Sequence, residues 1–358
     1  MRAVPERGGL FLYKKFTLCY CKVIRNNVYI YYIVNKAGDI LNKNENIYPA
    51  LAQVRDEIKK VIIGKDEVIE AVLMTILSGG HVLLEDIPGV GKTTLALGFS
   101  KTLSLGYRRM QFTPDTLPGD VTGFSMYNKQ TGLFEYKEGA VMCNLFLADE
   151  INRTSPKTQS ALLEVMEEGK VTVDGVTHTL PSPFFVIATQ NPLGSAGTQK
   201  LPESQLDRFM VRLSMGYPDA ASEALMLKLE NTSNIDELKS IVSLDEIKQM
   251  QATIKDLHAE DCIFDYIASL TLASRNSEWL KSGISPRGAK ALLRMARSCA
   301  FLHQRNYVVP EDILTVMPMT ASHRVTLSSK AKAAGRTEEE VIREIMGSVE
   351  MPLVKVKK

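Results

Sequence analysis

The sequence has little of several features that would place it in a specialised class of protein. It holds five cysteines among 358 residues, without zinc-binding spacing, so we expect reduced thiols, as in a cytoplasmic protein. The five histidines are scattered, and we expect no bound transition metal. No run of about 18 apolar residues occurs, which argues against a membrane-spanning helix. The net charge is only +2, which gives no reason to expect a nucleic-acid partner.

What the sequence has is an ordinary globular composition, with 45% hydrophobic and 23% charged residues. Residues 1–46 differ from the rest, because they hold eight Lys or Arg against three Asp or Glu. A signal peptide is one interpretation, although Lys14 and Lys15 interrupt its apolar region. A hairpin that turns at Asn26-Asn27 is another. We favour an atypical extension, either translated from upstream of the true start or poorly ordered.

From residue 47 onward, strand-like and helical patterns alternate. Helical spacing covers 47–60 and 66–78, and short apolar runs predict strands at 81–85, 144–148, 184–189 and 209–213. The alternation predicts an α/β domain over residues 47–218, with a parallel sheet flanked by helices.

The strand pattern ends after Pro218. We therefore predict a smaller all-α domain over residues 219–358. Its helices are expected to break at Ser282-Gly283, Pro286, Pro310 and Pro318.

A glycine-rich loop follows the strand predicted at 81–85 and precedes a helix that starts at Lys92. Its backbone N–H groups and the helix N-terminus favour a polyphosphate. Lys92 would reach the β- and γ-phosphates, and the Thr93 hydroxyl would bind Mg²⁺. The full pattern has glycine where this chain has Asp86, a departure of little expected consequence because Gly89 and Gly91 remain. An ordinary glycine-rich turn is the alternative.

Adjacent carboxylates end the strand predicted at 144–148. Burying Asp149 and Glu150 at a strand end is costly unless they are used. We assign Asp149 to a metal ion and Glu150 to the attacking water. The alternative is a helix N-cap followed by a first-turn acid, since a helix is expected from Ser155.

Three further polar residues are candidates for the same chemistry. Asn191 ends the strand predicted at 184–189 and would lie beside the γ-phosphate if that strand neighbours the phosphate loop. Arg208 could reach a neighbouring subunit's γ-phosphate, and Arg287 starts a helix facing a cleft. The alternatives are a turn-forming asparagine before proline, a surface ion pair and a solvated arginine at a helix start.

In this order, these pieces resemble the AAA+ ATPases, and the surrounding sequence is similar to the MoxR family. The resemblance runs from about residue 47 to 353. It is carried by the stretches 61–65, 84–94, 148–160, 188–192, 201–209 and 285–288, of which 149–160 is the most specific. The implied fold is an AAA+ P-loop domain followed by a helical lid domain.

The resemblance also implies roles for individual residues. The adenine pocket would be lined by Ile62, Ile63 and Gly64. The Walker A residues that hold ATP would be Pro88, Gly89, Val90, Gly91, Lys92, Thr93 and Thr94. Mg²⁺ would bind Thr93 and the Walker B Asp149, and Glu150 would polarise water. Asn191 would be sensor 1, Arg208 the arginine finger and Arg287 sensor 2.

Two hairpins fit the same resemblance. One runs over 124–136 with its turn at 128–132, and the other over 170–180 with an Asp174-Gly175 turn. In relatives such hairpins face the central pore of a ring, commonly a hexamer. Family partners carry a von Willebrand factor A domain.

We therefore predict an ATP-hydrolysing machine that remodels or activates partner proteins, in chaperone-like maturation or metal-cofactor insertion. A nucleotide-dependent assembly scaffold is one alternative, which the presence of Glu150, Asn191 and Arg208 disfavours. A magnesium-chelatase-type or DNA-acting motor is another. Outside residues 1–46 the chain carries 35 basic against 38 acidic residues, so we expect no nucleic acid to bind.

Overall fold

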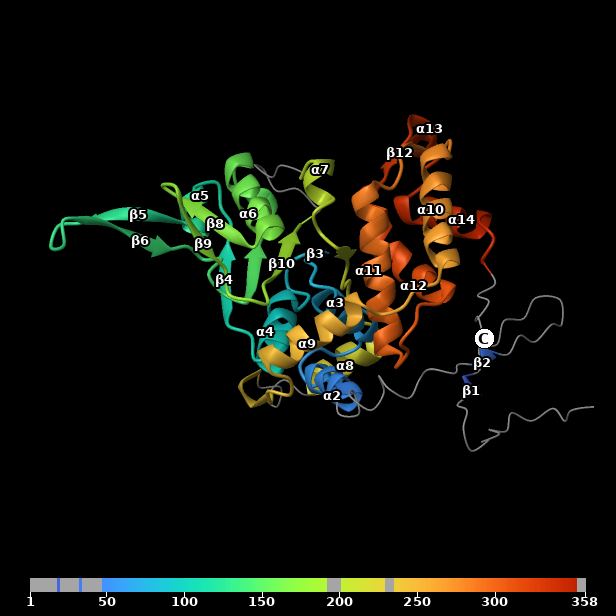
Figure 1. The fold of residues 1–358 in the computed structure, drawn as a ribbon, viewed down its shortest axis with the longest axis horizontal. Coiled ribbons are helices and arrows are strands. Elements are labelled where there is room, and N and C mark those ends of the chain that lie inside the picture. The colour runs from blue at the N-terminus through green and yellow to red at the C-terminus, as the bar shows by residue number, and fades with distance from the viewer. Residues whose placement is uncertain (1–17, 20–31, 34–46, 192–200, 229–234, 353–358) are drawn as a thin grey trace, which may run out of the picture.

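The computed structural model describes residues 18–19, 32–33, 47–191, 201–228 and 235–352. Figure 1 shows an α/β part with a long projecting hairpin and, beside it, a bundle of helices. Residues 18–19 (β1) and 32–33 (β2) pair antiparallel, in line with the hairpin alternative for the first 46 residues. The turn expected at Asn26-Asn27 lies outside the described residues.

The described strands of the α/β part include a five-stranded sheet in the order β11-β3-β10-β7-β4, in which every pair is parallel. Its members are β3 (Val82–Glu85), β4 (Tyr107–Gln111), β7 (Leu145–Asp149), β10 (Phe185–Gln190) and β11 (Val211–Leu213). Four of them lie where the apolar runs predicted strands. The parallel sheet flanked by helices is confirmed.

Strand β4 was not predicted. Its sequence, YRRMQ, carries Arg108 and Arg109 on exposed positions, because β4 is the edge strand and pairs only with β7. A half-exposed edge strand does not need the continuous apolar run that marks a buried parallel strand.

Helices cover both faces of the sheet. Leu145 and Leu147 of β7 belong to a core shared with α2 (Ile47–Lys59), α3 (Asp66–Leu77) and α4 (Lys92–Thr102). Phe146 and Ala148, which point the other way, pack in a second core with α6 (Pro156–Glu168). Burial on both faces explains why the central strands read as unbroken apolar runs.

Local signals set the ends of α6. Ser155 caps its N-terminus by accepting a hydrogen bond from the Thr158 N–H, and Pro156 occupies the first turn. Gly169 follows the helix with φ +63°, the left-handed conformation that ends many helices. The N-cap is therefore Ser155, and Asp149 belongs to the strand end rather than to this helix.

Both predicted hairpins are present. The first pairs β5 (Gly123–Asn128) with β6 (Leu133–Glu138) after the short helix α5 (Pro118–Thr122). It projects far from the body of the protein (Figure 1). The second pairs β8 (Lys170–Val173) with β9 (Val176–Thr179) around the Asp174-Gly175 turn. The Tyr136 and His178 rings stack at 3.8 Å, so the hairpins touch.

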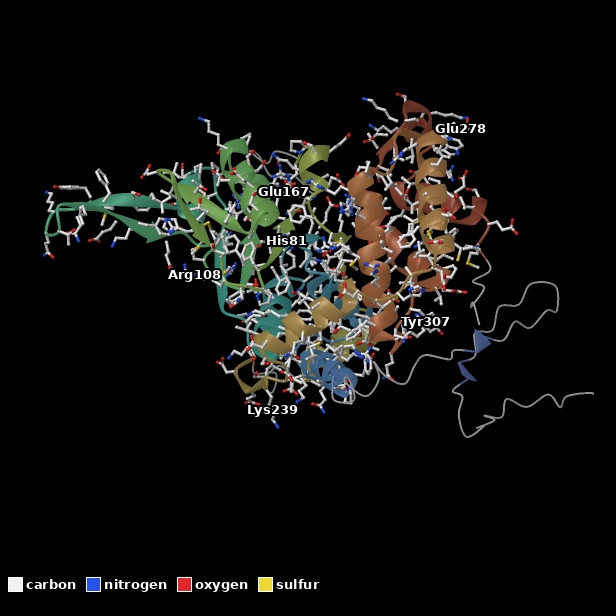
Figure 2. The ribbon with its side chains drawn as sticks, viewed as in Figure 1. His81, Arg108, Glu167, Lys239, Glu278 and Tyr307 are labelled. Carbon is white, nitrogen blue, oxygen red and sulfur yellow. The ribbon has the colours of Figure 1, made fainter. Side chains whose placement is uncertain are left out.

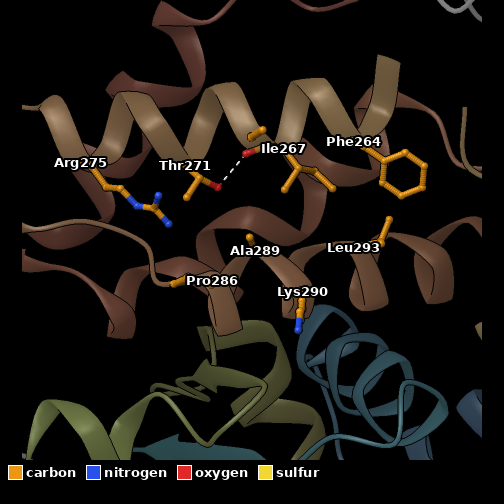
Figure 3. A pocket seen from close by; sticks show the side chains of 9 residues that line it. Phe264, Ile267, Thr271, Arg275, Pro286, Ala289, Lys290 and Leu293 are labelled. Atoms are coloured by element: carbon orange, nitrogen blue, oxygen red, sulfur yellow. Dashed lines mark hydrogen bonds between the residues drawn. The ribbon is translucent and has the colours of Figure 1, made fainter. Parts of the chain in front are cut away.

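The chain after β11 is mainly helical. Its described helices of four or more residues are α8 (Ala220–Lys228), α9 (Leu244–Lys255), α10 (Asp261–Asn276), α11 (Pro286–Leu302), α12 (Pro310–Ala321), α13 (Ser329–Ala333) and α14 (Glu338–Ser348). Helices α10 and α11 border an apolar groove of about 440 Å³, lined by Phe264, Ile267 and Leu293 among others (Figure 3). No helix in the described ranges combines the length and apolar character needed to cross a bilayer.

The predicted helical character of this part is confirmed, with two local differences. Strands β12 (Leu280–Ser282) and β13 (Thr326–Leu327) form a short antiparallel ladder, which two or three residues are too few to reveal as a pattern. Pro318 does not break α12, which continues to Ala321, because burial of the residues around it offsets the one lost backbone hydrogen bond. There the Pro318 carbonyl still accepts a hydrogen bond from Ser322 Oγ at 2.6 Å.

Candidate active site

The glycine-rich loop connects β3 to α4 and ends in two left-handed glycines. Gly89 has φ +87° and Gly91 has φ +93°. A Cβ at Gly89 would meet no atom within 4 Å, so backbone conformation, not crowding, favours glycine there. No side chain caps the N-terminus of α4. Its first N–H groups therefore suit an anion.

Lys92 lies over this loop. Its Nζ donates hydrogen bonds to the carbonyl oxygens of Asp86 at 3.0 Å and Ile87 at 2.8 Å. Burial lowers the pKa of Lys92, while the nearby carboxylates of Asp86, Asp149 and Glu150 act in the opposite direction. The amino group is thus held at the loop by acceptors that a phosphate oxygen can replace.

Asp149 ends β7 with both carboxylate oxygens engaged. Oδ1 accepts a hydrogen bond from Thr189 Oγ1 at 2.6 Å, and Oδ2 pairs with Arg109 Nη2 at 2.7 Å. Thr189 lies on the adjacent strand β10, so the sheet itself orients the carboxylate. Oxygen ligands of this kind suit Mg²⁺.

Glu150 adopts a left-handed conformation, with φ +56° and ψ +46°. This conformation costs about 1–2 kcal/mol in a residue other than glycine. The Glu150 N–H donates to Thr189 Oγ1 at 2.9 Å, and its Oε2 accepts from Arg153 at 2.7 Å and Gln111 at 3.3 Å. Backbone strain at a strand end is a frequent mark of a functional site.

These groups border one pocket of about 430 Å³. Most of the expected phosphate and metal residues line it, together with Glu150 and Asn191. The lining residues are Asp86, Pro88, Gly89, Gly91, Lys92, Thr93, Thr94, Arg109, Gln111, Asp149, Glu150, Thr189, Gln190 and Asn191. Strand β10, which carries Asn191 at its end, does lie beside β3 and the phosphate loop. The donor set fits a Mg²⁺-bound polyphosphate.

Asp86 makes contacts that the sequence did not predict. It is only 4% exposed. Its Oδ1 accepts hydrogen bonds from Ser214 Oγ at 2.8 Å and the Gly216 N–H at 3.0 Å, and its Oδ2 accepts from the Met215 N–H at 2.6 Å. Asp86 therefore ties the phosphate loop to the segment that leads from β11 into the helical part.

The residues expected at adenine do not line this pocket, and of the three Ile62 packs against the loop. A Cβ at Gly91 would lie 3.6 Å from Ile62 Cδ1, so Ile62 packs behind the loop. Gly64 has φ +70°, and a Cβ there would clash with Ser222 Oγ of α8. Ile63 is half-buried, and Val90 packs against the larger core.

Arg208 and Arg287 do not line the pocket either. Both pair with Glu167, in the last turn of α6. Figure 2 labels Glu167. Arg208 Nε is 3.5 Å from Glu167 Oε2, and Arg287 pairs with Glu167 Oε1. The structure thus brings the two arginines together, away from the Lys92 pocket of their own chain.

A set of possible metal ligands lies in the helical part. Ligand atoms of Cys299, His303 and Asp312 come within 4.8 Å of one another, although the scattered histidines gave no such expectation. Asp312 accepts hydrogen bonds from both terminal nitrogens, Nη1 and Nη2, of the Arg305 guanidinium. Burial raises the pKa of the Cys299 thiol well above its ordinary range. A paired arginine and a protonated thiol do not favour a cation there.

Comparison with known proteins defines the class of protein. A family model described as "ATPase family associated with various cellular activities (AAA)" matches residues 81–211, and an AAA lid domain model matches residues 272–345. A crystal structure of a protein from Cytophaga hutchinsonii superposes with a TM-score of 0.81 at 37% identity, covering 88% of this chain and 98% of that one. The chain is an AAA ATPase, an enzyme that binds ATP.

The relatives define the family within this class. Chaperone MoxR1 of Mycobacterium tuberculosis is 37% identical over 307 residues, 83% of this chain and 81% of the relative. Protein MoxR of Methylorubrum extorquens is 30% identical over 303 residues, 78% of this chain and 88% of the relative. The uncharacterized protein YeaC of Bacillus subtilis is 46% identical over 310 residues, 86% and 97% of the two chains. This chain belongs to the MoxR family of AAA ATPases.

Proposed function

We propose that this ATPase hydrolyses Mg²⁺-bound ATP in a ring of identical subunits, a hexamer, and uses the cycle to remodel partner proteins in the cytoplasm. One observation carries the proposal. The pocket gathers Lys92, Asp149 and Glu150, whereas Arg208 and Arg287 lie together at Glu167. A site whose arginines lie elsewhere on the chain suits completion by a neighbouring copy.

Within the pocket, each residue has a role that its position supports. Lys92 and the N-terminal N–H groups of α4 bind the β- and γ-phosphates. Thr93 and Asp149 hold Mg²⁺, which neutralises phosphate charge when bound. Glu150 orients the attacking water, with the help of Asn191. Ile62, which packs behind the loop, contacts the adenine together with Ile63 and Gly64.

Asp86 supports a route from the pocket to the rest of the molecule. It lies in the phosphate loop, and its carboxylate accepts hydrogen bonds from residues 214–216, which lead into the helical part. A change at the γ-phosphate can thereby alter the angle between the two parts. We place the predicted domain boundaries, 47–218 and 219–358, at this connection.

The hairpin β5–β6 supports contact with a client protein. Its exposed side chains include Phe124, Tyr127, Leu133 and Phe134, which is 74% exposed. Exposed apolar groups on a projecting element commonly mark protein contacts. The name of the M. tuberculosis relative, Chaperone MoxR1, supports a chaperone-like action. Maturation or metal-cofactor insertion, with a von Willebrand factor A domain protein as partner, is the pathway we favour.

The proposal is tested by separating nucleotide binding from turnover and from client contact. Lys92→Ala should abolish ATP binding, whereas Glu150→Gln should keep binding and lower turnover by at least about 100-fold. Phe134→Ser should keep turnover and lose protection of a heat-unfolded model protein from aggregation, measured by light scattering with ATP. Thr131→Ser, in the turn of the same hairpin, is the control. Full activity in Glu150→Gln would contradict the site, and full protection by Phe134→Ser would contradict the client surface.

A further inference from the structure

A single carboxylate joins the two arginines that lie outside the ATP pocket. Glu167 approaches Arg208 with Oε2 and Arg287 with Oε1. Arg208 follows the short helix α7 (Glu203–Leu206), and Arg287 stands in the first turn of α11. Figure 2 shows Glu167 on the side of the α/β part that faces the helical bundle.

The segments that carry these arginines are fixed to each other by a second set of contacts. Asp207 accepts a hydrogen bond from Ser285 Oγ at 3.0 Å and pairs with Arg324 Nε at 2.8 Å. The Arg324 side chain is 2% exposed and also donates to the Met210 carbonyl at 3.0 Å. The backbone next to both arginines is therefore held, while their side chains, 31% and 45% exposed, pair with Glu167.

We propose that Glu167 is a positioning residue: it aligns Arg208 and Arg287 as one pair for the phosphates of ATP bound to a second copy of this chain. The inference rests on the proposed sharing of sites between subunits. Two guanidinium groups repel each other, and a carboxylate between them offsets the repulsion. Two aligned guanidinium groups can each donate paired hydrogen bonds to phosphate oxygens.

A purely stabilising role does not account for Glu167. Its side chain is 39% exposed, and ion pairs at that exposure contribute little to stability. Its neighbour Glu168, 51% exposed and 3.5 Å from Lys170, is a matched control because it makes an ordinary surface pair on the same helix turn.

The test mixes subunits that are inactive alone. The donor carries Glu150→Gln and keeps its arginines. The acceptor carries Arg208→Ala with Arg287→Ala and keeps its own pocket. An equimolar mixture should recover ATPase activity. Adding Glu167→Gln to the donor should lower the recovered kcat about tenfold, or about 1.4 kcal/mol in the barrier, with KM for ATP unchanged. Adding it to the acceptor should change nothing.

The results distinguish the role of Glu167 from the sharing of the ATP site between subunits. Glu167→Asp in the donor should restore part of the kcat, and Glu168→Gln in the donor should leave it intact. The role of Glu167 would be overturned if Glu167→Gln lowered kcat equally in donor and acceptor, or did not lower it in the donor. It would also be overturned if sedimentation showed that the variant no longer forms the ring. An unmodified mixture without activity would overturn the shared site itself, and this inference with it.

Discussion

Replacing Asp86 by asparagine removes a charge from the junction of the phosphate loop and the helical part, with no change in size. Asparagine keeps one acceptor oxygen, which can still serve the Ser214 hydroxyl and the Gly216 N–H. Its NH₂ group then takes the place of Oδ2 and faces the Met215 N–H, donor against donor. The change therefore loses one charged hydrogen bond and leaves a buried N–H unpaired.

The expected cost follows from these contacts. A hydrogen bond to a charged group contributes about 1.5–3 kcal/mol, so Asp86→Asn should lower the free energy of unfolding by about 2–3 kcal/mol. Ser214→Ala removes a donor but leaves no buried backbone group unpaired, and should cost about 1 kcal/mol. ATP affinity should fall about tenfold in Asp86→Asn, because the phosphate loop loses part of its tie to residues 214–216.

Urea unfolding followed by circular dichroism measures the stability change, and the fluorescence of Trp279, the single tryptophan, reports separately on the helical part. Titration with a fluorescent ATP analogue measures the affinity. If Asp86→Asn stays within about 0.5 kcal/mol of the wild type and binds ATP equally well, Asp86 does not connect the loop to residues 214–216 in the way we describe.

Two further predictions concern buried and charged groups near the sheet. Burial lowers the pKa of His81 from 6.5 to about 4, and its Nδ1 accepts the Val186 N–H while Nε2 donates to the Met166 carbonyl. Between pH 6.5 and 4, His81 is protonated in the unfolded chain but neutral in the folded chain. The free energy of unfolding therefore decreases as the pH falls through this range. We expect protonation of His81 to lower the free energy of unfolding by about 2 kcal/mol at pH 5 relative to pH 8, and His81→Asn to reduce the pH dependence by that amount; an unchanged slope would contradict the assignment. Arg109→Met removes the cation 2.7 Å from Asp149, and should lower the Mg²⁺ concentration needed for half-maximal ATP binding by up to about fivefold. A higher Mg²⁺ requirement would mean that Arg109 assists the bound nucleotide instead.

The sequence predicted those parts of the fold that local patterns determine. Buried parallel strands read as apolar runs, and the Asp174-Gly175 turn sits where paired strands need left-handed residues. Strand β4 was not predicted because it is an edge strand with exposed side chains, and such a strand does not need an unbroken apolar run. Motif spacing located Lys92, Asp149 and Glu150, since the carboxyl ends of neighbouring parallel strands meet at one edge of the sheet.

Long-range contacts could not be predicted from the same patterns. Asp86 stands where the usual phosphate loop has glycine. Its hydrogen-bond partners, residues 214–216, are far away in the sequence, and no local pattern predicts the contact. Glu167 reads as an ordinary helix-surface acid, and only the folded chain brings Arg208 and Arg287 to it. The sequence motifs identified both arginines as candidates. They did not determine whether the arginines act on the nucleotide of their own subunit or of a neighbouring one.

The central claim is that each ATP site needs a neighbouring subunit. The most direct test measures ATPase rate per subunit against protein concentration for the wild type, Glu150→Gln and Arg208→Ala. We predict a wild-type rate that rises with concentration until the ring is assembled, and collapse of the rate in both variants. A rate that is independent of concentration and unaffected by Arg208→Ala would contradict the shared site.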